Sequence, residues 1–124
     1  MIAIPLKDSS STTISDLYGN APYFALLDPT SGYFSVSDNK GCGDGMKTAD
    51  CVKELGATST MFYHMGEGVY NQLSKYGVEV YTSSKTLLTI EEIYRKLLDN
   101  ECKLVTKSNS DSLLDSGSSS CTCN

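Results

Sequence analysis

The sequence predicts an α/β fold in which helices flank a mixed β-sheet. Short runs of branched and aromatic residues fill the first third of the chain. Later runs of the same length alternate with segments whose apolar residues recur every three or four positions. The expected order is therefore β-β-β-α-β-α-β-α. Strands that alternate with helices pair in parallel through right-handed crossovers, whereas an early hairpin contributes antiparallel strands.

Five segments have the length and composition of strands. The alternating apolar residues of Met1–Leu6 predict the first. The aromatic runs Pro22–Asp28 and Gly32–Asp38 predict the second and third, and the Pro-Thr-Ser connection between them favours a β-hairpin. A short apolar run at Ser59–Tyr63 predicts the fourth strand, and "VEVYTS" after Gly77 predicts the fifth. "CKLV" is a candidate for a final extended piece.

Three helices are predicted from apolar spacing and end signals. The first follows the glycine-rich loop Asn39–Gly45 and ends at Gly56, where a helix C-cap is expected. The second ends at Gly77. The third begins with a capping box at Thr89-Ile90-Glu91-Glu92, because the threonine hydroxyl and the glutamate carboxylate can each bond the other residue's N–H. The apolar positions that define these helices are Met46, Ala49, Val52 and Leu55, then Val69, Leu73 and Tyr76, then Ile90, Ile93, Leu97 and Leu98.

Domain organisation follows from a change of composition after Val105. Residues 1–105 carry the periodic segments and are predicted to form one domain, since 124 residues are too few for two ordinary ones. Residues 106–124 are rich in serine and lack periodicity. Such a segment cannot bury enough apolar surface to offset its ordering entropy, so a disordered tail is predicted.

Composition excludes several classes of function. Hydrophobic residues make up 40% of the chain and charged residues 20%, which is typical of a globular protein. No apolar run approaches the ~20 residues of a membrane helix, and the first residues lack the features of a signal peptide. A cytoplasmic protein without a membrane partner is expected. The net charge is −5 and Arg95 is the only arginine, so no nucleic-acid partner is expected.

The five cysteines are expected to be free thiols. Their number is odd, no CxxC pair occurs, and a cytoplasmic compartment keeps thiols reduced. Cys51 lies near an apolar helix stripe and Cys102 near a strand, so both are expected to be buried at least in part. The pair Cys121 and Cys123 could chelate a soft metal or be inert.

Several segments together resemble the dinitrogenase iron-molybdenum cofactor biosynthesis family. The resemblance covers Met1–Val105 and is carried most specifically by "YGNAPYFALLD" and "YNQLSKYGVEVY", with "MIAIPLKD" opening the domain. It implies a ribonuclease H-like three-layer fold with a five-stranded mixed sheet, in which the first three strands are antiparallel and the next two parallel. It also implies a small protein that binds or carries an iron-molybdenum or other metal–sulfur cluster, with cofactor donor and acceptor proteins as partners.

The candidate binding site combines the glycine-rich loop with the end of the fourth strand. In open α/β sheets, ligands bind beyond the carboxyl ends of parallel strands. Cys42 and His64 are soft or borderline metal ligands, and Met65 adds a thioether. Gly43 and Gly66 allow the backbone to approach a bulky cofactor. The predicted cofactor contacts are Cys42, Gly43, His64, Met65 and Gly66, with Cys42 and His64 as metal ligands. Each residue also has a structural interpretation: His64 as a strand-end residue, Cys42 as an exposed thiol and Met65 as packing.

Other functions remain as alternatives. A domain of the same fold that binds no metal and acts through protein contacts is the main one. A metal-dependent nuclease would need clustered carboxylates, but Asp8, Asp28 and Asp38 each follow a strand as turn residues do. "GCGDG" lacks the spacing of a phosphate-binding loop. The prediction is therefore a monomeric binding or carrier protein, not an enzyme.

Overall fold

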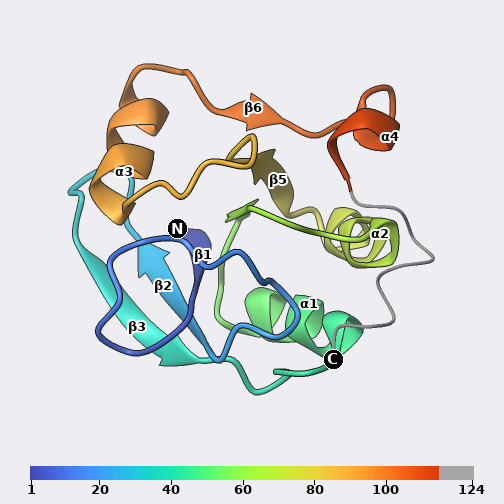
Figure 1. Cartoon of the computed structure of the whole chain (residues 1–124), viewed down its shortest axis with the longest axis horizontal. Coiled ribbons are helices and arrows are strands. Elements are labelled where there is room, and N and C mark those ends of the chain that lie inside the picture. The colour runs from blue at the N-terminus through green and yellow to red at the C-terminus, as the bar shows by residue number, and fades with distance from the viewer. Residues whose placement is uncertain (115–124) are drawn as a thin grey trace.

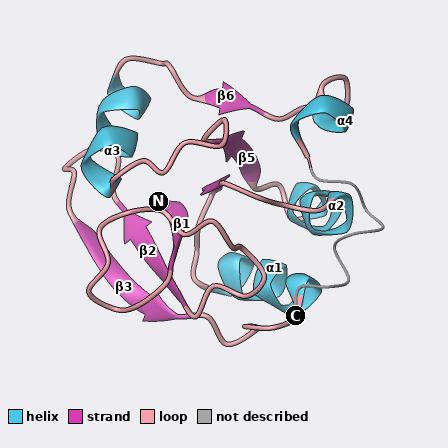
Figure 2. Cartoon of the chain, viewed as in Figure 1, coloured by secondary structure: helices cyan, strands magenta, loops and turns pink. Residues whose placement is uncertain are grey.

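A computed structural model describes residues 1–114, and it consists of three layers. A six-stranded sheet in the order β3-β2-β1-β4-β5-β6 forms the middle layer. Helices α1 and α2 pack on one face of the sheet and α3 on the other (Figure 1). The strands are β1 (Ile2–Leu6), β2 (Tyr23–Leu27), β3 (Phe34–Asp38), β4 (Ser59–Phe62), β5 (Glu79–Thr82) and β6 (Lys103–Leu104). The helices are α1 (Gly45–Glu54), α2 (Glu67–Lys75), α3 (Ile90–Leu98) and α4 (Ser110–Leu113) (Figure 2).

The sheet topology confirms the predicted mixed α/β fold. β1 pairs antiparallel with β2, and β2 antiparallel with β3. On its other side β1 pairs parallel with β4, and β4 parallel with β5. This arrangement agrees with the ribonuclease H-like fold that the resemblance implied.

The number of strands differs from the prediction. We expected five, and the structure has a sixth, β6, which pairs antiparallel with β5. β6 consists of two residues, Lys103 and Leu104, both exposed. It lies within "CKLV", the segment that the sequence offered as a candidate for a final extended piece.

Two hydrophobic clusters form the core, one on each face of the sheet. Side chains alternate between the faces along each strand. In β1, for example, Ala3 joins the cluster under α1 and α2, whereas Ile2, Ile4 and Leu6 join the cluster under α3. All five residues of β1 are buried, as expected for a strand covered on both faces.

The structure describes a short helix beyond the predicted domain end at residue 105. Val105 is 4% exposed, and the short helix α4 follows it. Leu113 and Leu114 pack against the cluster under α1 and α2. Two adjacent leucines in this serine-rich segment thus cover apolar surface, and the division of the chain at residue 105 stays a prediction. Residues 115–124, including Cys121 and Cys123, lie outside the described residues.

Within residues 1–114, the structure contains no helix long and apolar enough to cross a membrane.

Candidate functional site

The site is built at the edge of the sheet where the parallel strands β1, β4 and β5 end. The connection after β4 leads into α2, which packs on one face, and the connection after β5 leads toward α3 on the other face. The two connections therefore leave neighbouring parallel strands in opposite directions. Such a topological switch point is where open α/β sheets bind ligands. We call this edge, formed by residues 63–66 and 83–86, the rim.

His64 lies at the rim, two residues after the end of β4, and its side chain is exposed. Its Nδ1 is 2.6 Å from Nζ of Lys85, which lies in the connection after β5. The imidazole also meets the Tyr63 ring edge-on, with the ring centroids 4.7 Å apart. Lys85 Nζ is 5.9 Å from the centroid of the Tyr63 ring, within reach of a cation–π interaction. The imidazole, the only one in the chain, thus contacts an ammonium group and a tyrosine ring.

A strained turn presents Lys85 to His64. Ser84 and Lys85 both have positive φ angles, 57° and 60°. The Thr86 N–H donates to the Ser83 carbonyl over 3.2 Å, so residues 83–86 form a turn with two successive left-handed residues. Glycine, asparagine or aspartate usually fills such positions, and other side chains cost roughly 1 kcal/mol each. A further hydrogen bond stabilises the turn, because the Ser84 N–H donates to Oγ1 of Thr82, the last residue of β5, over 3.0 Å.

Ser83 contributes a buried hydroxyl at the base of this turn. The residue is 5% exposed, and its backbone N–H donates to the Phe62 carbonyl at the end of β4. Among residues 1–114 its Oγ finds no hydrogen-bond partner. Buried hydroxyls normally have a hydrogen-bond partner, so the burial of this one lowers the stability of the folded state.

Met65 and Gly66 connect the rim to α2. Met65 is 2% exposed and belongs to the cluster under α1 and α2, so its thioether packs in the core. Gly66 is the N-cap of α2, and within the described part of the chain no side chain caps this helix. Helix N-termini of this kind suit anions, because their first amides have no partner within the helix.

The glycine-rich loop lies at the start of α1. Cys42 is exposed, and its Sγ donates to the Asn20 carbonyl over 3.4 Å. The Gly43 N–H donates to the Gly19 carbonyl over 2.9 Å. Asp44 caps α1, accepting from two backbone N–H groups of its first turn. Because a carboxylate already occupies this helix end, α1 is a poorer anion site than α2.

The two predicted loops share one edge of the molecule. A Cβ on Gly45, the first residue of α1, would lie 2.6 Å from Cγ2 of Val69 in the first turn of α2. The starts of α1 and α2 therefore lie side by side, and the loops that precede them open at the same end. The Cys42 and His64 side chains nevertheless make separate contacts, one to Asn20 and the other to Lys85. Across residues 1–114, no group of three or more His, Cys, Asp or Glu residues gathers closely enough to hold a metal ion.

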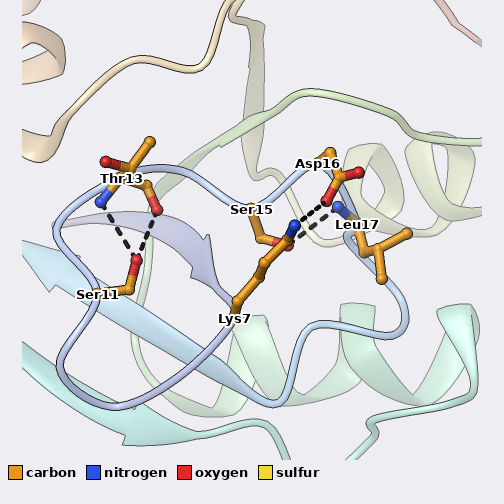
Figure 3. Close-up of polar contacts among 6 residues, drawn as sticks. All are labelled: Lys7, Ser11, Thr13, Ser15, Asp16 and Leu17. Carbon is orange, nitrogen blue, oxygen red and sulfur yellow. Dashed lines mark hydrogen bonds and ion pairs between the residues drawn. The ribbon is translucent and has the colours of Figure 1, made fainter.

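The connection from β1 to β2 completes this end of the molecule (Figure 3). Lys7 Nζ lies 3.2 Å from Asp16 Oδ1, an exposed ion pair that contributes little to stability. The Leu17 N–H donates to Ser15 Oγ over 3.0 Å, and the turn leads directly to Tyr18. The buried Tyr18 hydroxyl bonds Thr60 of β4 over 2.7 Å, and burial raises its pKa well above the usual range. This bond fixes the segment that carries Gly19 and Asn20 over the sheet.

The remaining candidates have structural roles. Cys51 is 5% exposed and Cys102 is half-buried, as predicted, and burial raises the pKa of the Cys102 thiol. Asp28 accepts from the Thr30 N–H, and this bond lowers the pKa of its carboxyl. Asp8 likewise accepts from the Ser10 N–H. Both carboxylates act as turn residues, which agrees with the sequence interpretation.

Lys85 was not among the residues predicted from the sequence. Its segment, Ser83-Ser84-Lys85-Thr86, contains no glycine, asparagine or aspartate, the residues that usually indicate a turn with left-handed φ angles. Only its position between a strand and a capping box, where a ligand-binding connection is expected, could have drawn attention to it.

Comparison with known proteins gives a family and a fold. The family model described as dinitrogenase iron-molybdenum cofactor matches residues 1–100. Among curated proteins, none matches the chain. Among solved structures, the apo form of the orange protein from Desulfovibrio gigas is 19% identical with a TM-score of 0.74, covering 85% of this chain and 92% of that chain. A Thermotoga protein, provisionally named NifB and assigned to the DUF35 family, is 24% identical with a TM-score of 0.69, covering 86% and 93%. At these identities the structural likeness establishes the fold.

Proposed function

The chain belongs to the dinitrogenase iron-molybdenum cofactor family, and on this premise we propose that it binds a metal–sulfur cofactor, or a precursor of one, and transfers it to another protein. The cargo is an iron-molybdenum or related metal–sulfur cluster. The partners are a donor and an acceptor of that cluster, met by a monomer in the cytoplasm. The protein binds and releases its cargo without chemical turnover.

One observation carries this proposal: the only histidine of the chain stands beside a lysine at the topological switch point of the sheet. The helix that follows, α2, begins with amides that no side chain caps within residues 1–114. Clusters and thiometalates are anions, so a cation and a helix N-terminus suit them. The exposed thiol of Cys42, at the same end of the molecule, is a soft ligand for the metal.

The residues proposed to contact the cargo are Cys42, Gly43, His64 and Gly66. Cys42 is the leading direct metal ligand, since thiolates bind iron and copper strongly. Gly43 and Gly66 have no side chain, so the backbone can approach a bulky group closely at these positions. Met65, also predicted as a contact, is better assigned to packing because it lies in the core.

A domain of this fold that binds no metal is the second candidate. The absence of a three-ligand group among residues 1–114 favours it. In this alternative the rim serves a protein partner, and Cys42 has no ligand role.

Anaerobic loading of the purified protein separates the two candidates. The protein is incubated with tetrathiomolybdate and either ferrous or cuprous ion, desalted, and examined by visible absorption and metal analysis. We expect retained absorbance with a fixed ratio of metal to protein, and its loss in Cys42→Ser. The half-buried Cys102→Ser is the matched control and should load normally. A protein that emerges colourless under all these conditions supports the metal-free domain.

A further inference from the structure

We propose that β3, the outer strand of the sheet, binds a second copy of this chain by antiparallel pairing of β3 with β3, so that two sheets become one (Figure 1). In the order of strands, β2 and β1 separate β3 from β4, at whose end the rim begins. The inference thus concerns another surface and goes beyond the function proposed above.

The backbone of β3 has hydrogen-bonding groups that face away from the sheet. Just before the strand, the Tyr33 carbonyl accepts from the Asp28 N–H. Just after it, the Asn39 N–H donates to the Pro22 carbonyl. Because backbone groups alternate in direction along an antiparallel strand, residues 33, 35, 37 and 39 face β2. The backbone groups of residues 34, 36 and 38 therefore face outward, where no strand of residues 1–114 lies.

β3 lacks the features by which sheet edges usually avoid further pairing. Protected edges are very short, or they carry lysine, proline or a bulge. The opposite edge fits this description, since β6 has two residues and one of them is Lys103. β3 has five residues in continuous register with β2 and contains neither lysine nor proline. Its Phe34 is 42% exposed and the preceding Tyr33 is 81% exposed, so β3 is the edge that suits another strand.

A second β3 complements this edge when Val36 of one copy lies opposite Val36 of the other. The outward backbone groups of the two strands then meet, and Phe34 of each copy lies opposite Asp38 of the other. The two valines form a β-branched pair, and each Phe34 ring can reach the other copy's Val36 diagonally. The Asp38 carbonyl has one weak contact already, from Cys51 Sγ at 3.8 Å.

The charges of the edge permit this pairing although the chain carries a net charge of −5. Asp38 is the only charged residue of β3. In the proposed register the two Asp38 carboxylates lie four residues apart along the strands, about 14 Å. That separation exceeds the Debye length of ~8 Å at physiological salt. No like charges therefore oppose each other directly across the two-fold axis.

Antiparallel pairing of β3 leaves the rim of each copy open. β3 runs parallel to β1, because both strands pair antiparallel with β2. The parallel strands of the two copies therefore point in opposite directions, and the two rims open at opposite ends of the joined sheet. A five-residue strand buries less than the ~800 Å² per partner of a standard stable complex. The dimer is therefore reversible, and a free copy is the monomer of the function proposed above.

Amide hydrogen exchange tests the pairing residue by residue, by ¹⁵N NMR of the full chain at low and high protein concentration. We expect the N–H groups of Phe34, Val36 and Asp38 to exchange more slowly as the concentration rises. The N–H groups of Ser35 and Ser37 face β2, so they are internal controls and should change little. Exchange at residues 34, 36 and 38 that does not depend on concentration overturns the proposal.

Substitutions at Phe34 test the register. Analytical ultracentrifugation gives the dissociation constant of the dimer, and circular dichroism checks folding. Phe34→Asp places a carboxylate opposite Asp38, and should weaken association about tenfold relative to Phe34→Lys, which places an ammonium group there. Leu104→Asp, at a site 38% exposed on β6, is the matched control at the opposite edge and should leave association unchanged. The register is wrong if Phe34→Asp and Phe34→Lys weaken association equally, and the surface is wrong if Phe34→Asp and Leu104→Asp behave alike.

Other occupants of the edge would give a different result. If the protein stays monomeric, and residues 34, 36 and 38 are protected only after another protein is added, β3 binds that protein and pairing with a second copy is wrong. The proposed function is tested separately. A protein that dimerises without retaining metal keeps this inference and loses that function, and one that retains metal without dimerising does the reverse.

Discussion

At the scale of single residues, the Ser83 hydroxyl is a polar group whose burial is not compensated by a hydrogen bond within residues 1–114. It is buried at the base of the rim without a hydrogen-bond partner among the described residues. A buried polar group in this state lowers stability, so its removal should be favourable. Ser83→Ala is expected to stabilise the protein by about 1 kcal/mol in urea unfolding, with an unchanged m-value.

Thr60 provides the matched contrast to Ser83. Its buried hydroxyl donates to the Ala3 carbonyl over 2.8 Å and also bonds Tyr18. Thr60→Val should therefore destabilise by about 1–3 kcal/mol, because it leaves those partners unsatisfied. Equal losses in Thr60→Val and Ser83→Ala would mean that Ser83 has a partner which residues 1–114 do not provide.

At the scale of elements, a polar cluster joins α1 to α2 on the outer side of the molecule. The Tyr76 hydroxyl donates a short hydrogen bond to the Asp50 carboxylate. Gln72 Nε2 donates to the same oxygen over 3.2 Å and to the Tyr76 hydroxyl over 2.9 Å. The hydrogen bond from Tyr76, more than that from Gln72, lowers the pKa of Asp50, and the same contact raises the pKa of Tyr76.

These shifts predict how the coupling between the two helices depends on pH. The folded state lowers the pKa of Asp50, so the stability it contributes is present above the ordinary value of 3.8 and is lost as pH falls through the folded value. A double-mutant cycle of Asp50→Asn and Tyr76→Phe should show favourable coupling at pH 7 that disappears in strong acid. The exposed Tyr33→Phe serves as control. A coupling that does not decrease as pH is lowered below 3.8, through the acidic range in which the protein stays folded, would contradict the assignment to an ionised carboxylate.

Elements defined by local interactions were the ones that the sequence could predict. The capping box of α3 is present as expected: Glu92 N–H donates to Thr89 Oγ1, and Thr89 N–H to Glu92 Oε1. Gly56 and Gly77 end their helices with positive φ angles. Each of these features depends on residues within a few positions of one another, so composition and spacing contain the information.

Contacts between distant segments were not accessible in the same way. His64 and Lys85 are separated by 21 positions, and Asp50 and Tyr76 by 26. The sequence pattern correctly predicted that His64 follows a strand, but it did not predict which side chain His64 contacts. Which side chain meets it depends on the pairing of β4 with β5 and on an unusual turn. The same limit applied to Cys42, whose neighbour Asn20 comes from the connection before β2.

At the scale of the whole molecule, the rim follows from the connectivity of the layers. Helices α1 and α2 lie on one face and α3 on the other, so the switch point falls between β4 and β5. No single residue creates it. The order of strands and helices, which the sequence predicted, was enough to identify this edge as the candidate site, whereas the side-chain contacts at the edge required coordinates.

The end of the folded domain can be tested at this same scale. Leu113 and Leu114 pack against the cluster under α1 and α2, and Asn109 ties their segment to β6 through its bond to the Leu104 carbonyl. Replacing both leucines with alanine in the full chain should lower the free energy of unfolding by about 2 kcal/mol, since each is half-buried. Leu87→Ala, at a site 56% exposed, is the control and should cost much less. Urea unfolding measures both. If the double variant loses no more than the control, the apolar contacts of residues 113 and 114 add nothing, and the domain ends at Val105 as composition alone suggested.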